Sequence, residues 1–204
     1  MKYAILFLSL LIGYLLGSLS FAVIIGKLFF KKDVREVGSK SAGATNVLRT
    51  LGKKAAAAVT VGDMLKGIIA YLIAYPIGVI YGVGEFCAIL AGSGAVFGHI
   101  FPLYFNFKGG KGVLSSLALS FMIDWRVALV TLLVAILIMA VTKYVSLGSM
   151  LGCVFNSIAI CFFANGNYLK IITIVFFTIV VIIKHKANII RLIKGQESKL
   201  GQKV

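Results

Sequence analysis

Long apolar runs follow one another along almost the whole chain, and they constrain its fold more than any other feature. A helix that crosses a bilayer needs roughly 20 mostly apolar residues, although shorter and tilted helices are tolerated. By this measure we expect about seven transmembrane helices, near residues 3–27, 56–80, 86–106, 113–123, 127–142, 147–164 and 168–184. The sequence therefore predicts an all-α, polytopic membrane protein in which residues 1–204 form a single integral-membrane domain.

The composition excludes other classes of protein. Only 13% of the residues are charged, which is too few for the polar surface of a soluble domain. Cationic loops at a membrane surface already explain the net charge of +15, so no nucleic acid is expected as a partner. Cys87, Cys153 and Cys161 lie in apolar runs without a C-x-x-C pair, so we expect no disulfide and no metal site. No cofactor is expected either.

The lysines and arginines predict how the chain lies in the membrane. They gather in the loop of residues 31–54 and in the tail after residue 183, and seven spans put both regions on one side with Lys108, Lys111 and Lys143. Positive residues are retained in the cytoplasm, so we expect the N-terminus outside and the C-terminus in the cytoplasm of a bacterial cell. The segment 113–123 is the shortest, and if it does not cross the membrane all later loops change sides.

Five polar, glycine-containing segments would then meet on the cytoplasmic face. They are GSKSAGATN (38–46), GDMLKG (62–67), GHIFPLYFNFKGGKG (98–112), KYVSLGS (143–149) and KHKANIIRLIKGQESK (184–199). In FKGGKG, the glycines let the backbone approach a ligand and the lysines add positive charge, which suits phosphate. A plain basic loop between two helices is the alternative interpretation of that segment.

A pocket roofed by these segments would contain hydroxyls, amides and cations, which are hydrogen-bond donors for anionic oxygens. Its candidates are Ser39, Ser41, Thr45, Asn46, Arg49, Lys111, Ser146, Ser149, His185 and Asn188. Few carboxylates are near, and neither a P-loop nor a Ser-His-Asp set is indicated, so we expect positioning and charge stabilisation to dominate over general-base chemistry.

Other small or charged residues have two interpretations. The pairs Gly13 with Gly17, Gly94 with Gly98 and Gly148 with Gly152 follow the small-xxx-small pattern of close helix packing. Asp63 and Lys66 lie three residues apart within the second span, where they either neutralise each other or serve the reaction.

In this order, the motifs resemble those of the bacterial PlsY family, the integral-membrane acyl-phosphate:glycerol-3-phosphate acyltransferases. The resemblance runs from Gly17 to about Lys199 through D-x-R-x-x-GS, GATN-x-x-R, GD-x-x-KG, GH-x-FP, FKGGKG, YVSLGS and KH-x-x-NI-x-R-L-x-x-G-x-E. The family usually reads GSGN where this chain has GSKS, so Lys40 and Ser41 replace a glycine and an asparagine. After GGKGV, Leu114 and Ser115 replace the usual Ala-Thr.

The resemblance implies an enzyme that moves a fatty acyl group from acyl phosphate to the sn-1 hydroxyl of glycerol 3-phosphate, giving lysophosphatidic acid and inorganic phosphate. It implies a multi-pass protein of the bacterial cell membrane with its active site facing the cytoplasm, and as partners the two substrates and the lipid bilayer. Catalysis would fall to Ser39, Arg49 and Lys111, and substrate binding to Gly43, Thr45, Asn46, Gly109, Gly110, Gly112, Ser146, Ser149, His185 and Asn188.

A transporter of an organic phosphate is the alternative from another class, because carriers also bind anions in basic pockets between broken helices. Two features disfavour it: the chain has no obvious inverted repeat, and its polar motifs gather on one side of the membrane.

Overall fold

The computed structural model describes residues 1–202, and the described chain is built from helices without β-strands, as predicted. Lys203, one of the cations of the predicted tail, lies outside the described residues. The elements are α1 (Lys2–Gly17), α2 (Phe21–Phe30), α3 (Ala44–Thr50), α4 (Lys53–Ile80), α5 (Gly84–Ile100), the 3-10 turn η1 (Leu103–Phe105), α6 (Val113–Ile123), α7 (Trp125–Thr142), α8 (Val145–Phe163), α9 (Tyr168–Lys184) and α10 (Lys186–Ile193).

Five of the predicted spans are long and apolar enough to cross a bilayer by themselves. They are Lys2–Phe30, Lys53–Ile80, Gly84–Phe105, Trp125–Thr142 and Val145–Phe163. Helices α9 and α10 form a sixth only if they are taken together, and they are bent by 58° where they join. The remaining segment, α6, has 11 residues. At 1.5 Å per residue it covers only about half of a bilayer core, so it is a half-length helix.

The first span is broken, which the sequence did not predict. Helix α1 ends at Gly17 and α2 begins at Phe21. At the break, the Ser18 hydroxyl donates to the Tyr14 carbonyl at 2.8 Å and accepts the Leu103 N–H at 3.2 Å. The carbonyl of Leu19 accepts from the Lys66 ammonium at 2.9 Å. Contacts with distant residues therefore hold the break, because they supply partners for groups that a continuous helix would pair internally.

The small-xxx-small glycines pack as predicted. A Cβ added at Gly17 would lie 2.5 Å from the Cα of Ala95, and one at Gly98 would lie 2.7 Å from the carbonyl carbon of Gly17. Gly13 and Gly94 meet the facing backbone in the same way, so α1 and α5 touch along their main chains. Gly148 and Gly152 of α8 likewise allow α7 to pack closely against that helix. These contacts join α5 to α1 and α8 to α7.

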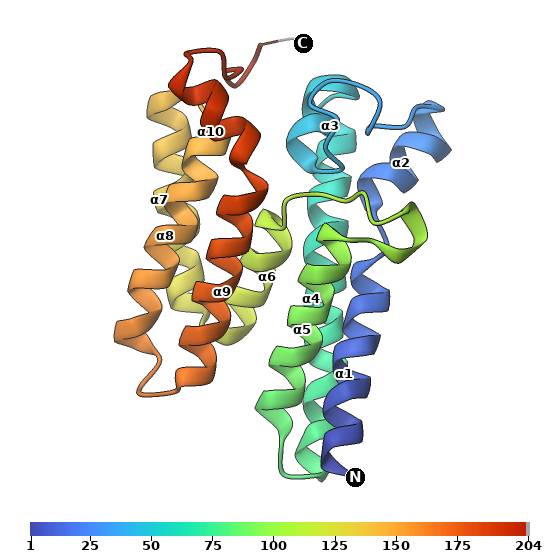
Figure 1. Cartoon of the computed structure of the whole chain (residues 1–204), viewed down its shortest axis with the longest axis vertical. Helices are drawn as coiled ribbons and strands as arrows, with labels where there is room; N and C mark the ends of the chain where they lie inside the picture. The colour runs from blue at the N-terminus through green and yellow to red at the C-terminus, as the bar shows by residue number, and fades with distance from the viewer. Residues whose placement is uncertain (203–204) are drawn as a thin grey trace.

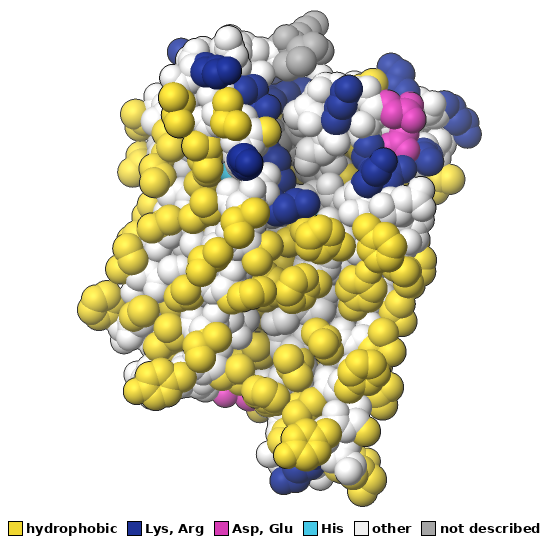
Figure 2. All heavy atoms as spheres, in the orientation of Figure 1, with side chains coloured by type: hydrophobic (Ala, Val, Ile, Leu, Met, Phe, Trp, Pro, Cys, Tyr) yellow, Lys and Arg dark blue, Asp and Glu magenta, His cyan; other side chains and the backbone are white. Residues whose placement is uncertain are grey.

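The helices form two groups with α6 between them (Figure 1). Helices α1, α4 and α5 pack together on one side, α7, α8 and α9 on the other, and α6 contacts members of both. The termini lie at opposite ends of the molecule, and α2, α3 and α10 lie at the C-terminal end. Figure 2 shows lysine and arginine gathered at that end, above a broad hydrophobic belt. This charge distribution has the one-sided pattern that the sequence predicts.

Candidate active site

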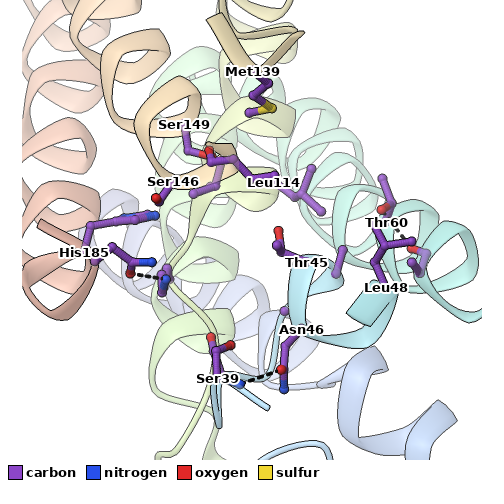
Figure 3. A pocket seen from close by; sticks show the side chains of 18 of the residues that line it. Ser39, Thr45, Asn46, Leu48, Thr60, Leu114, Met139, Ser146, Ser149 and His185 are labelled. Carbon is purple, nitrogen blue, oxygen red and sulfur yellow. Dashed lines mark hydrogen bonds between the residues drawn. The ribbon is translucent and has the colours of Figure 1, made fainter. Parts of the chain in front are cut away.

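A cavity of about 350 Å³ opens between the two helix groups at the cation-rich end. Figure 3 shows it bounded by α3 and α4 on one side and by α8 and the α9–α10 junction on the other. All the predicted site residues except Gly109 and Gly110 line it: Ser39, Gly43, Thr45, Asn46, Arg49, Lys111, Gly112, Ser146, Ser149, His185 and Asn188. Residues far apart in sequence, such as Ser39 and Asn188, thus share one site.

One wall of the cavity consists of α3 and the loop before it. The side chain of Asn46, 1% exposed, donates to the carbonyls of Val34 at 2.7 Å and Val37 at 3.1 Å. Its Oδ1 accepts the N–H of Ser39 at 2.9 Å (Figure 3). Both amide protons of Asn46 are thus committed to the backbone. Asn46 therefore fixes the loop that carries Ser39, and Thr45 presents its hydroxyl to the cavity from the same helix.

Arg49 ends this wall and joins it to the C-terminal tail. Its guanidinium donates to the carbonyl of Ser198 at 3.1 Å. An arginine has five N–H donors, so this bond leaves others for a ligand in the cavity. Arg49 thereby offers positive charge at the mouth of the site while it holds the tail in place.

The opposite wall carries His185, Asn188, Ser146 and Ser149, all at most 7% exposed. His185 Nδ1 lies 2.8 Å from the carbonyl of Val181. A carbonyl can only accept, so Nδ1 carries the proton and Nε2 of the neutral ring is an acceptor. The His185 ring extends into the cavity beside Ser146 (Figure 3). This wall can therefore receive a ligand hydroxyl as well as anionic oxygens.

Glu197 organises the same wall, although the sequence predictions did not include it in the site. Its carboxylate, in a residue 7% exposed, accepts from Ser146 Oγ, Asn188 Nδ2 and Arg191 Nε, each at 2.7 Å. Burial opposes the charge, but these hydrogen bonds and the Arg191 guanidinium lower the pKa of Glu197. The signal that points to it is a single carboxylate in a basic, glycine-containing tail.

Lys111 lies between the two walls, and its ammonium donates to Asn188 Oδ1. Asn188 thus links the cation of Lys111 to the carboxylate of Glu197. Burial lowers the pKa of Lys111 to about 8, an effect that Glu197 opposes and that Arg191 and Arg49 reinforce. An anion bound beside Lys111 would remove part of this penalty, which favours an anionic ligand.

The glycines of the FKGGKG loop have different surroundings. Gly112, at φ +88°, is the N-cap of α6 and lines the cavity, so the first N–H groups of α6 lie beside it. Gly109 and Gly110 do not line the cavity, in contrast to the prediction. They pack against His99, and a Cβ at either position would collide with that residue. A glycine has no side chain that shows which neighbour requires it, so the motif alone does not distinguish the two situations.

Three further polar residues line the cavity without having been predicted as site residues: Thr60 and Asp63 on α4, and His99 on α5. Asp63 and Lys66 form the ion pair that the sequence offered as one alternative, with 3.0 Å between Asp63 Oδ1 and Lys66 Nζ. The motifs GDMLKG and GHIFP contain these residues, but they give no sign that His99 joins the pair.

A second cavity of about 100 Å³ adjoins the first and extends between α6, α7, α8 and α9. The second cavity is also lined by Ile174 and Phe177. The two cavities share Val113, Leu114, Leu132, Ala135, Met139 and Ser149. The site therefore combines a polar, cationic mouth with an apolar extension into the membrane-spanning region.

Known proteins resemble this chain in sequence and in fold. The family model described as glycerol-3-phosphate acyltransferase matches residues 7–195. A glycerol-3-phosphate acyltransferase of Brucella anthropi is 43% identical over 195 residues, which are 96% of this chain and 93% of that protein. One of Thermoanaerobacter pseudethanolicus is 41% identical over 201 residues, which are 98% of each chain.

Two crystal structures extend this likeness to three dimensions. Both are of PlsY, an integral membrane glycerol 3-phosphate acyltransferase, in its glycerol 3-phosphate form and its lysophosphatidic acid form. The first has a TM-score of 0.88 at 36% identity and covers 96% of both chains. The second has a TM-score of 0.84 at 35% identity and covers 96% of this chain and 95% of that one. The chain therefore belongs to the glycerol-3-phosphate acyltransferase family of integral membrane proteins.

Proposed function

We propose that this protein transfers a fatty acyl group from acyl phosphate to the sn-1 hydroxyl of glycerol 3-phosphate. The hydroxyl oxygen attacks the acyl carbonyl carbon, and the bond between that carbon and the phosphate oxygen breaks. The electron pair leaves with the phosphate, and the hydroxyl proton passes to a phosphate oxygen. The products are lysophosphatidic acid and inorganic phosphate, so atoms and charges balance without a covalent enzyme intermediate.

The observation that carries this proposal is the cavity itself, because its parts match the two substrates. Lys111 and Arg49 supply positive charge, hydroxyls and N–H groups surround them, and an apolar cavity continues inward. Preorganised donors of this kind stabilise the charge that develops on phosphate and carbonyl oxygens during acyl transfer. Glu197 is already held by three donors, so it is poorly suited to act as a base.

We assign the two phosphates to the two walls. Ser39 and Thr45, beside Gly43, face the cavity from the α3 side and suit the acyl phosphate. His185 and Asn188 lie with Lys111 and Ser149 on the other side and suit glycerol 3-phosphate. The acceptor nitrogen of His185 can bind a hydroxyl group of the glycerol moiety. The phosphate groups of the two substrates offer no such donor.

We assign the acyl chain to the second, mainly apolar cavity between α6, α7, α8 and α9. Leu114 and Met139 lie where the polar and apolar cavities meet, so a chain whose phosphate sits at the mouth can pass between them. Leu114→Trp narrows this passage while it keeps the polar site, so it should shift preference toward shorter acyl phosphates. Ile136→Trp is the matched control, because Ile136 lines the mouth but not the deeper cavity.

Purified protein in lipid nanodiscs, supplied with palmitoyl phosphate and radiolabelled glycerol 3-phosphate, tests the reaction. We expect labelled lysophosphatidic acid and inorganic phosphate in equal amounts, and strong loss of both with Lys111→Ala or Arg49→Ala. Removal of one such donor costs on the order of 10²-fold in kcat/KM. Uptake of labelled glycerol 3-phosphate into proteoliposomes without lysophosphatidic acid would instead support a transporter.

We propose further that the protein spans the bacterial cell membrane with its site toward the cytoplasm, the N-terminus outside and the C-terminus inside. The basis is the gathering of lysine and arginine at the end that carries the cavity. Single cysteines at Gln202 and Asn165, both exposed and at opposite ends of the fold, test this orientation with an impermeant thiol reagent. On intact cells, Asn165→Cys should react and Gln202→Cys should not, and the reverse pattern would invert the proposed orientation.

A further inference from the structure

Three buried ionisable side chains form a cluster beside the cavity. The proposed reaction gives this cluster no role. Asp63 and Lys66 come from α4 and His99 from α5, and they are 1%, 4% and 5% exposed. Ionisable groups at membrane depth are expensive to bury and are retained where they serve a purpose. Asp63 and His99 also line the active-site cavity, whereas Lys66 lies behind them.

The Lys66 ammonium is the centre of this cluster. Its Nζ lies 2.9 Å from the carbonyl of Leu19, 3.0 Å from Asp63 Oδ1 and 3.2 Å from His99 Nδ1. The ammonium donates to the Leu19 carbonyl and forms an ion pair with Asp63, whose Oδ1 also lies 3.4 Å from His99 Nδ1. An ammonium can only donate, so His99 Nδ1 accepts in its contact with Lys66. The cluster thus fixes the orientation of the His99 ring and ties α4 and α5 to the break in the first span.

His99 in turn holds the glycine loop. Its carbonyl accepts the N–H of Gly110 at 3.0 Å. A Cβ at Gly110 would collide with His99 Nε2 and lie 2.8 Å from the carbonyl of Ala42. A Cβ at Gly109 would collide with the His99 carbonyl oxygen. The backbone and ring of His99 therefore pack directly against these two glycines. Lys111 is the next residue in the chain, so its position depends on this packing.

We propose that Asp63, Lys66 and His99 are positioning residues that seat Gly109 and Gly110 and thereby fix the place of Lys111. The proposal rests on the proposed function for the part that Lys111 plays in binding glycerol 3-phosphate. The cluster acts through the loop: it holds the segment that carries the cation, and Lys111 itself contacts the substrate.

A double-mutant cycle with His99→Ala and Lys111→Gln tests this route. A misplacement of about 1 Å at a reacting group costs on the order of 10²-fold, so His99→Ala should lower kcat/KM for glycerol 3-phosphate by that order. In the Lys111→Gln background it should cost little more, because the misplaced group is already absent. His99→Asn, whose Oδ1 can accept from Lys66, should lie between wild type and His99→Ala. Additive losses would overturn the proposal, since His99 would then act independently of Lys111.

A second measurement reports on the loop without any substrate. A nitroxide at Lys108→Cys, an exposed loop position, is followed by electron paramagnetic resonance in a chain whose native cysteines are replaced. His99→Ala should make the label more mobile. Glu85→Gln is the matched control, because it breaks the 2.9 Å ion pair with Lys170 at the other end of the fold and should leave the label unchanged.

The two measurements separate the positioning role from the reaction. Absence of turnover by the wild-type protein would refute the proposed function, while the label would still report whether His99 seats the loop. Unchanged mobility with wild-type kinetics in His99→Ala would overturn the positioning role. If His99→Ala does not fold, Asp63→Leu combined with Lys66→Met removes both charges together and carries the same expectations.

Discussion

The charge of Lys111 predicts a specific pH dependence for the reaction. Burial lowers the pKa of this ammonium to about 8, so the group is charged below that pH and neutral above it. Glycerol 3-phosphate loses its second phosphate proton near pH ~6, so the substrate is a dianion throughout the alkaline range. Only the protonated lysine attracts it. The second-order rate constant kcat/KM for glycerol 3-phosphate should therefore fall above pH 8.

The size of the fall follows from the titration of one group. At one pH unit above its pKa, about one lysine in eleven keeps its proton, so kcat/KM drops roughly tenfold for each further unit. The rate constant kcat at saturating substrate should fall later, because a bound phosphate dianion raises the pKa of its lysine partner. The two profiles should therefore separate on the alkaline side.

Initial rates at low glycerol 3-phosphate, measured between about pH 7 and pH 10, give the profile. Lys111→Arg should be slower but should lose the alkaline limb, because a guanidinium stays charged over this range. Lys108→Arg is the control, since Lys108 is exposed in the same loop and its replacement should leave the limb in place. An alkaline limb at the same pH in Lys111→Arg would refute the assignment to Lys111.

Two further predictions follow from the walls of the cavity. His185→Ala and Asn188→Ala should mainly raise the KM for glycerol 3-phosphate, whereas Ser39→Ala and Thr45→Ala should mainly impair use of acyl phosphate; an identical pattern toward both substrates in all four would contradict the division. Glu197→Gln keeps one acceptor oxygen for three donors, so at least one donor loses its partner, and the free energy of unfolding should fall by roughly 1–3 kcal/mol in thermal or denaturant unfolding. Because the pKa of Glu197 is lowered in the fold, that loss should shrink as the pH falls through this pKa, and a loss independent of pH would argue against it.

Most of the helices could be predicted from the sequence because apolar run length is a local property. Residues 113–123 and 168–184 agree with α6 and α9, and the other spans differ from the prediction by a few residues at their ends. The break at Leu19 could not be predicted in the same way. It depends on partners from α4 and from the loop after α5, which become neighbours only in the folded chain.

The site was partly predictable for a related reason. Successive membrane-spanning helices place alternate loops on the same side of the membrane, whatever the exact course of each loop. Arg49, Lys111 and Asn188 could therefore be grouped from the sequence. Which group each side chain contacts is set by tertiary geometry. Asn46 is committed to the loop backbone, and Glu197 folds back from the tail to bind Asn188. Neither contact leaves a periodic pattern in the sequence.

The glycine contacts between α1 and α5 also determine where the protein tolerates genetic variation. In the most apolar stretch of the span Gly84–Phe105, which contains α5, 67% of the residues are buried, against 22% in the span Trp125–Thr142 of α7. A saturation scan should therefore accept many apolar exchanges in α7 and few in α5. Gly98 touches α1 and is followed directly by His99, whose carbonyl binds the Gly110 N–H, so Gly98→Ala should disturb the glycine loop as well as the packing. Conditional alleles of this enzyme should therefore cluster along the α1–α5 contact, at glycines that do not themselves line the cavity.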